Sequence, residues 1–312
     1  MFWKNDGLRF QERIAGRGYR LMSNPYITRN GGATVTVFVP YDCKNNCPFC
    51  INKQEYACTE GFSAEKICQS IRTMHEITPE CDFVFTGGEP LADLDSLQSM
   101  LDIIPATHRI FVNTTLPLMQ SYTTDDIVSF LNRNVGKITC INVSRHTRKY
   151  VVEGDDDIFD RIEVPKRINC VLFGEVKEEK ISGFINRFQA HGLPIQFRSD
   201  YTHTTPENLY DIADDQIYQL LDKMLGCTGA SGCRMRCNFD FGNGNPAISY
   251  HKTLPYSTVT VQRNGKSYDI LYDIIVKQNG DIHSDWTGVK LDVEAYRKVV
   301  FEPYDLHAFN TK

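Results

Sequence analysis

Six short runs of apolar, often β-branched residues recur along the first two thirds of this chain. They occupy residues 33–39, 82–86, 109–113, 138–143, 168–173 and 194–198. Segments with apolar residues three or four positions apart lie between them, at residues 63–74, 94–103, 125–132, 158–162 and 181–189. Short apolar runs are typical of buried strands, and the wider spacing is typical of helices. Alternation of the two predicts an α/β fold with a parallel sheet and right-handed crossovers.

The number of strand–helix units limits the architecture. Six units are too few to close an eight-stranded barrel, which leaves a partial barrel or an open sheet of the flavodoxin type. Ligands bind at the carboxyl ends of the strands in both arrangements. We therefore look for chemistry where the apolar runs end.

The pattern changes after residue 205. Residues 206–225 predict one more helix, and residues 257–262 and 268–277 predict β-hairpin strands with Asn-Gly turns. We therefore expect an N-terminal segment (1–30), an α/β domain (31–205) and a smaller C-terminal domain (206–312).

Three cysteines follow the first apolar run at the spacing C-x3-C-x2-C: Cys43, Cys47 and Cys50. A structural zinc site or a closed iron–sulfur cluster normally takes four protein ligands, so three leave one position open. Zinc or a loose group of disulfides are the alternatives for this trio.

The second apolar run ends in Gly87-Gly88-Glu89-Pro90. Adjacent glycines after a strand indicate a turn where the backbone approaches a ligand closely or needs positive φ. With C-x3-C-x2-C after one strand and G-G-E-P after the next, the chain resembles the radical S-adenosylmethionine (SAM) superfamily. The resemblance implies a partial (β/α)6 barrel and a [4Fe–4S] cluster on the three cysteines. It also implies that the open iron binds SAM and that Gly87 to Pro90 contact the SAM amino group.

Further cofactor contacts are expected at other strand ends. The resemblance implies that Asn113 and Ser144 contact the methionine part or ribose of SAM, and that Arg198 pairs with the SAM carboxylate. Strand alternation puts Asn142 on the same face as Ser144, so it is a further candidate. Phe49 is expected to pack over the cluster or the adenine. Asn113 could instead satisfy a turn, Arg198 could form a surface ion pair, and Phe49 could be core.

A second trio, Cys227, Cys233 and Cys237, has the spacing C-x5-C-x3-C. This half of the chain resembles the SPASM and twitch extensions of radical SAM enzymes, which implies a second [4Fe–4S] cluster. The sequence departs from the full SPASM pattern, because Met224 occupies one cysteine position and residues 280–286 contain no cysteine. At most one auxiliary cluster is therefore expected, with zinc as the alternative. The segment 168–198 also resembles the molybdenum-cofactor GTP cyclase, but the chain lacks that family's terminal pair of glycines.

Composition narrows the choice of partners. The net charge of −5 argues against a broad nucleic-acid footprint. There is no apolar run long enough for a membrane span and no signal peptide at the start, so we expect a cytoplasmic protein. Eleven cysteines in that compartment indicate metal or redox chemistry rather than disulfides.

The resemblance implies a specific reaction. SAM is cleaved reductively to a 5′-deoxyadenosyl radical, which abstracts a hydrogen atom from a small-molecule or peptide substrate, and an auxiliary cluster assists. Flavodoxin or ferredoxin is the expected electron donor. The alternative is a non-catalytic iron–sulfur or zinc protein for electron transfer or partner binding, which leaves Gly87 to Pro90 unexplained.

Overall fold

The computed structural model describes residues 26–29, 33–39, 43–50, 61–78, 80–116, 121–233, 235–242, 246–255, 258–263, 265–286, 288–302 and 307–308. All six strands predicted from the apolar runs are present in one sheet. They are β2 (Thr34–Val39), β3 (Phe83–Gly87), β4 (Ile110–Thr114), β5 (Cys140–Ser144), β6 (Lys166–Leu172) and β7 (Ile195–Ser199). These strands lie side by side in chain order and are all parallel. The predicted α/β class with a parallel sheet is confirmed.

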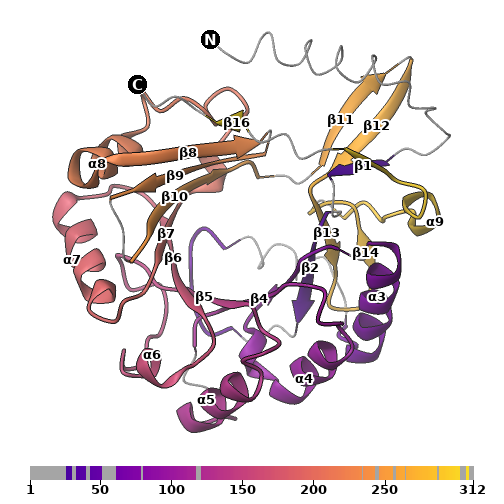
Figure 1. Ribbon diagram of the computed structural model, residues 1–312, viewed down its shortest axis with the longest axis horizontal. Helices are drawn as coiled ribbons and strands as arrows, with labels where there is room; N and C mark the ends of the chain where they lie inside the picture. The colour runs from indigo at the N-terminus through magenta and orange to yellow at the C-terminus, as the bar shows by residue number, and fades with distance from the viewer. Residues whose placement is uncertain are drawn as a thin grey trace.

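A helix follows each of the strands β2 to β6. The helices are α3 (Ala64–Ile77), α4 (Leu94–Asp102), α5 (Thr124–Arg133), α6 (Ile158–Arg161) and α7 (Glu178–Gln189), with a short 3-10 turn η1 (Pro90–Ala92) before α4. They line the outer side of the curved sheet (Figure 1). Three of them begin at side-chain caps, in which Ser63, Asp93 and Thr123 accept a backbone N–H of the first turn.

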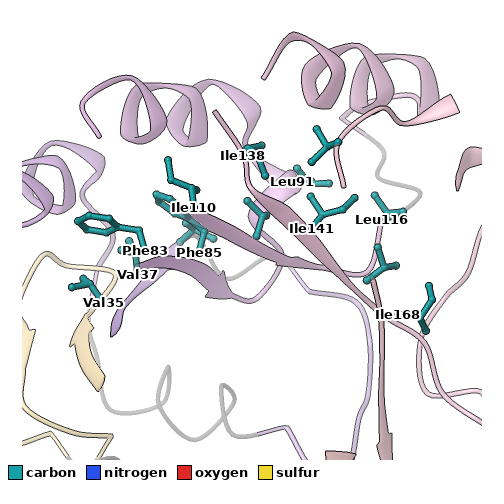
Figure 2. Packing of buried hydrophobic residues seen from close by; sticks show 14 of the residues in the cluster. Val35, Val37, Phe83, Phe85, Leu91, Ile110, Leu116, Ile138, Ile141 and Ile168 are labelled. Atoms are coloured by element: carbon teal, nitrogen blue, oxygen red, sulfur yellow. The ribbon is translucent and has the colours of Figure 1, made fainter. Parts of the chain in front are cut away.

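The two faces of the sheet differ in character. Apolar side chains on the outer face, such as Val37, Phe85 and Ile141, are fully buried against the helices (Figure 2). The residues between them point to the inner face and are mostly polar and half-buried, as the alternation along β6 shows. The outer face therefore forms the hydrophobic core and the inner face is left for polar functions.

The C-terminal third adds strands to both edges of this sheet. On one edge, β10 (Ile248–Thr253) pairs in parallel with β7 and continues through β9 (Arg236–Phe241), β8 (Cys227–Cys233) and β16 (His307–Ala308). On the other edge, β13 (Asp273–Val276) pairs in parallel with β2 and is followed by β14 (Ile282–His283). Residues from the expected C-terminal domain thus share a sheet with the expected α/β domain.

The helix predicted over residues 206–225 is shorter than expected. Residues 201–203 form a 3-10 turn, η2 (Tyr201–His203), and α8 begins only at Gln216 and ends at Leu225. Asp215 caps α8 by accepting the backbone N–H groups of Ile217 and Tyr218. The predicted start was wrong because an aspartate cap, not the first apolar residue, determines where this helix begins.

A smaller sheet lies beside the first. It contains β11 (Thr258–Arg263), β12 (Lys266–Leu271), β1 (Tyr26–Arg29) and β15 (Val300–Glu302), and the short helix α9 (Val293–Tyr296) precedes β15. The predicted hairpin is confirmed as the antiparallel pair β11–β12. The second predicted strand, 268–277, is split, because β12 and β13 belong to different sheets. Among the helices described, none combines the length and the apolar character that crossing a bilayer requires.

Candidate active site at the strand ends

The cysteine loop lies beyond the end of β2. The thiols of Cys43, Cys47 and Cys50 are half-buried and not in disulfides. Asn45 fixes the loop from within: its amide nitrogen donates to the Cys43 Sγ at 3.5 Å, and its oxygen accepts the Val152 backbone N–H at 2.8 Å. The loop is therefore tied to the segment that follows β5, on the side of the sheet where ligands of parallel α/β folds bind.

The Cys43 thiol lies close enough to Glu89 and Cys50 to be affected by their charges. Burial raises the pKa of Cys43, hydrogen bonds from Asn45 oppose that rise, and the nearby charges of Glu89 and Cys50 add to it. Because iron binds the thiolate, loading this loop with a cluster releases protons, and the raised pKa of Cys43 makes loading dependent on pH.

Glu89 is almost completely buried at the end of β3, with 1% exposure. Its Oε1 accepts from the Thr114 hydroxyl at 2.5 Å and from the Leu91 N–H at 3.1 Å. Its Oε2 accepts from the Thr115 N–H at 2.8 Å and the Thr115 hydroxyl at 2.7 Å. Burial raises the pKa of Glu89 in spite of these four donors. Both oxygens are occupied, so the carboxylate ties the ends of β3 and β4 together.

The backbone around Glu89 is shaped by glycine. Gly87 has a φ of +129°, which a residue with a Cβ rarely adopts. Gly88 follows in a bend, and Pro90 begins the 3-10 turn that Glu89 caps. The Gly87 to Pro90 segment therefore forms a fixed turn that is largely buried, with Gly88 as its half-buried residue.

Three polar side chains meet on the inner face across β4, β5 and β6, with Arg167 near the start of β6. The amide of Asn142 donates to the Asn113 Oδ1 at 2.8 Å. Arg167 donates to the Asn142 Oδ1 through both Nε, at 3.2 Å, and Nη2, at 2.7 Å. The structure thus brings the predicted Asn113 and Asn142 together, and Ser144 follows Asn142 by two residues on the same face. Sequence reasoning missed Arg167, although its position two residues before Asn169 on a strand places it on the inner face.

Phe49 belongs to an aromatic cluster beside the cysteine loop. Its ring lies 5.0 Å from His146 and 5.7 Å from both Tyr150 and Phe173, measured between centroids. His146 is buried, and desolvation lowers its pKa to about 4, so its ring is neutral at pH 7. Its Nδ1 has no hydrogen-bond partner among the described residues. The sequence marked Phe49, but His146 carried no signal beyond its place at a strand end.

Arg145 links the ends of β4 and β5 through its buried guanidinium. Its side chain is 1% exposed, and its Nη1 donates to the carbonyl oxygens of Thr115 and Ser144 at 2.7 and 2.9 Å. Thr115 in turn donates to Glu89. Burial lowers the pKa of Arg145, and Glu153, with an oxygen 4.0 Å from Nε, opposes this shift. Glu89, Thr115 and Arg145 therefore form a buried network under the candidate site.

Arg198 lies on β7 with its side chain on the inner face, because its neighbour Phe197 is buried in the outer core. Burial and the charges of Arg236 and Arg167 lower its pKa to about 10. This is not the environment of a surface ion pair, the alternative that the sequence left open.

The second cysteine trio lies on the β8–β9 hairpin. Cys233 is opposite Arg236 in the register, so Cys237, one residue further along β9, points to the other face of the sheet. Cys227 is opposite Phe241, four residues or about 13 Å along β9 from Cys237. The Cys237 thiol donates to the Leu209 carbonyl at 3.0 Å, and burial raises its pKa to about 12. The hairpin register therefore does not bring these three thiols to one point.

The donor set of the first trio fits an iron–sulfur cluster better than a single ion. Among the described residues, no three His, Cys, Asp or Glu side chains converge closely enough to bind one metal ion. A cubane makes a different demand, because each thiolate binds a different iron atom and the thiols stand apart around it. Three half-buried thiols within residues 43–50, a stretch without a fourth cysteine, meet this demand.

Comparisons with known proteins find similarity both in sequence and in fold. Residues 29–148 match the family described as "4Fe-4S single cluster domain". In sequence the chain is similar to the "Probable dual-specificity RNA methyltransferase RlmN" of Parabacteroides distasonis, with 35% identity over 96 residues. In structure it is similar to SuiB of Streptococcus suis, with a TM-score of 0.50, 12% identity and coverage of 83% of this chain. SuiB bound to its precursor peptide SuiA matches at a TM-score of 0.50 and 11% identity over 90% of this chain.

These relatives are longer than the matched region. The chain spans 27% of the RlmN relative and 60% of SuiB. The match to the single-cluster domain contains both the cysteine loop and the Gly87 to Pro90 turn, and a SAM-bound form of SuiB shares the fold at the same TM-score of 0.50. Residues 29–148 are therefore similar to a 4Fe-4S single cluster domain, and the chain shares the fold of SuiB.

Proposed function

We propose that this chain is an enzyme that cleaves SAM reductively and uses the resulting radical to abstract a hydrogen atom from a small-molecule or peptide substrate. The observation that carries the proposal is a loop with three half-buried thiols at the end of β2, of which Cys43 is close enough to the buried Glu89 at the end of β3 to be affected by its charge. Cys43, Cys47 and Cys50 would hold a [4Fe–4S] cluster, and that cluster would supply the one electron that reductive cleavage of SAM to methionine and a 5′-deoxyadenosyl radical requires.

The residues of the chain position the reactants. Because both oxygens of Glu89 are occupied by protein donors, we assign the contact with the SAM amino group to the backbone of Gly87 and Gly88, and a structural role to the carboxylate. Asn113, Asn142 and Ser144 offer polar groups on the inner face for the methionine part or ribose. Phe49 closes one side of the cysteine loop with its aromatic neighbours and limits the access of water.

Two observations bear on the substrate. SuiB, which shares the fold, has been crystallised with its precursor peptide SuiA. RlmN is named for RNA, but the net charge of −5 of this chain does not favour a polyanion. We therefore keep a small molecule or short peptide as the substrate class, with flavodoxin or ferredoxin as electron donor in the cytoplasm.

The sequence also predicts an auxiliary cluster on the second cysteine trio. A cluster on Cys227, Cys233 and Cys237 requires thiols from both faces of the β8–β9 hairpin to meet, and so a hairpin register that differs from the one observed. The iron content of the protein tests this directly, because one cubane accounts for about four irons per chain and two for about eight.

Anaerobic reconstitution followed by iron and sulfide counting is the decisive experiment. We compare the wild type with Cys43/Cys47/Cys50→Ala and with Cys227/Cys233/Cys237→Ala, and assay 5′-deoxyadenosine formation from SAM with dithionite. If the proposal holds, only the first variant loses SAM cleavage, and its iron content falls by about four. The second variant serves as the matched control, since it also removes three thiols, and its iron content reports the auxiliary cluster.

The non-catalytic alternative makes the opposite prediction. A cluster or zinc protein for electron transfer or partner binding would load metal but give no 5′-deoxyadenosine under any reductant. Full loading of about four irons without SAM cleavage, in the presence and absence of candidate substrates, would favour that alternative.

A further inference from the structure

The segment that follows β5 lies against the cysteine loop on one side. The Cys47 thiol donates to the backbone carbonyl of Tyr150 at 3.7 Å. Two residues further along, the backbone N–H of Val152 donates to the side-chain oxygen of Asn45 at 2.8 Å. The exposed side chains of this segment and of the loop therefore belong to one continuous surface beside the Cys47 thiol.

Three cations stand on this surface. Lys44 follows the first cysteine of the loop, Arg148 and Lys149 precede Tyr150, and all three side chains are exposed. In the described part of the chain, none of the three forms an ion pair with a carboxylate. Arg148 donates through Nη2 to the backbone carbonyl of Glu175 at 3.1 Å, which holds its guanidinium in place without neutralising it. We call these three residues the cationic patch.

The flanking segments carry carboxylates of their own, at Glu153, Asp155, Asp156, Asp157 and Glu175. Glu153 and Asp156 form ion pairs with Arg187 at 2.8 and 2.6 Å, and the Glu175 carboxylate lies 4.0 Å from Lys177. The remaining two lie where the chain enters α6, beyond the segment that contacts the loop. The surface next to the cysteine loop is therefore locally positive, although the chain as a whole has a net charge of −5.

Apolar groups accompany the cationic patch. Val152 is 58% exposed, which makes it the most exposed large apolar side chain among the described residues. Pro48, the residue after Cys47, is also exposed. Exposed apolar side chains beside charged ones are typical of surfaces that contact another protein.

The proposed function requires a protein that delivers electrons to the cluster. SAM and the substrate would occupy the polar inner face of the sheet, so an electron donor has to approach the cysteine loop from another side. The surface formed by the cationic patch, Val152 and Pro48 meets this requirement, because the Tyr150 carbonyl beside it contacts the Cys47 thiol directly.

We propose that this surface docks an acidic flavodoxin, which reduces the cluster by one electron. The inference rests on the proposed function and deepens it by placing the partner. In the transfer, the anionic flavin hydroquinone becomes the neutral semiquinone and the cluster gains the electron, so no proton moves and no bond is made or broken. The cationic patch complements acidic side chains on the donor, and Val152 and Pro48 suit the apolar edge of a flavin ring. A contact of this size is typical of transient electron-transfer complexes.

Anaerobic stopped-flow measurement of cluster reduction by flavodoxin hydroquinone tests the docking surface. We expect Lys44→Glu and Lys149→Glu each to lower the second-order rate constant about threefold to tenfold at low salt, and Lys149→Gln to lower it less. Added salt should reduce these differences because it screens exposed charges. Arg72→Glu makes the same change of charge on an exposed residue of α3 and is the matched control, with the rate constant of the wild type expected. Reduction of each preparation by dithionite corrects for its cluster content.

The result that overturns the proposal is a wild-type rate constant in both Lys→Glu variants at low salt. It is also overturned if these variants impair reduction by an acidic ferredoxin but not by flavodoxin, because the surface then serves a different carrier. Circular dichroism confirms folding, and Lys149→Gln carries the test if the charge reversals do not fold.

Formation of 5′-deoxyadenosine with dithionite, measured on the same preparations, separates this inference from the proposed function. SAM cleavage together with charge-independent reduction by flavodoxin refutes the docking surface alone. Charge-dependent reduction without SAM cleavage refutes the enzyme and supports the docking surface in a protein that only transfers electrons.

Discussion

Replacing Glu89 by glutamine tests whether this side chain acts as the structural tie between β3 and β4. Each of its oxygens accepts one backbone N–H and one hydroxyl. Glutamine keeps the shape of the side chain but replaces one oxygen with an NH2 group. A hydroxyl is able to rotate and accept from that NH2, whereas a backbone N–H is a donor only. One backbone N–H therefore loses its acceptor in either orientation of the amide.

The orientation with the smaller cost places the NH2 toward Leu91, whose hydrogen bond to Glu89 is the longest of the four at 3.1 Å. A buried donor left without an acceptor costs about 1–3 kcal/mol. We therefore expect Glu89→Gln to reduce the free energy of unfolding by about 1–3 kcal/mol at pH 7. The measurement is urea unfolding of the full chain without cluster, followed by circular dichroism.

Thr115→Val is the matched control. It removes the hydroxyl that donates to Oε2 at 2.7 Å and leaves the backbone N–H donor in place, so the expected loss is about 1 kcal/mol. If Glu89→Gln unfolds at the wild-type urea concentration, or is more stable than Thr115→Val, the carboxylate is not the structural tie. In that case its direct contact with SAM regains support.

Three other predictions follow from the same site. Gly87→Ala should lose about 1–3 kcal/mol in urea unfolding because its φ of +129° strains any residue with a Cβ; Gly136→Ala, where a Cβ meets nothing within 4 Å, should be near wild type. Asn142→Leu removes the acceptor of Arg167 and should cost about 1.5–3 kcal/mol, and a neutral result would contradict the inner-face network. His146 has a folded-state pKa of about 4 against 6.5 in the unfolded chain, so the unfolded state binds the proton first as pH falls. Wild-type stability should decline between pH 6.5 and 4, by on the order of 3 kcal/mol from this group; His146→Phe should flatten that decline, and identical pH profiles would refute the assignment.

The sequence predicted the strands well because their apolar residues face a continuous core. In β2, Val35 and Val37 alternate with Thr34 and Thr36, and in β3 the run Phe83 to Phe85 is apolar throughout, so both strands are visible without knowledge of tertiary contacts. The start of α8 was misplaced because Leu209 and Tyr210 resemble the beginning of a helix. The true start depends on the Asp215 carboxylate, which caps α8 and also forms a buried ion pair with Lys252 at 2.8 Å.

Site residues were predictable only where a short motif fixes them. The cysteine loop and the glycine turn are local, so spacing alone identifies them. Arg167, Thr115 and Arg145 act through partners about 25 to 30 positions away in the chain. Their roles depend on which strands are neighbours and in what register these strands pair. A shift of β6 by one residue relative to its neighbours would move the Arg167 side chain from the inner face to the outer core.

The two cysteine trios illustrate why spacing predicts a ligand set in one place and not in another. Cys43, Cys47 and Cys50 lie in a loop, where the backbone has no fixed period and the thiols are free to turn toward a common ligand. Cys233 and Cys237 lie on paired strands, where the pleat assigns each thiol to a face. Cys237 is one residue past Arg236, the register partner of Cys233, so the two thiols point to opposite faces of the hairpin. Closely spaced cysteines therefore carry less weight as metal ligands when the surrounding residues predict a hairpin. An iron content of about four per chain is the result that this reasoning predicts.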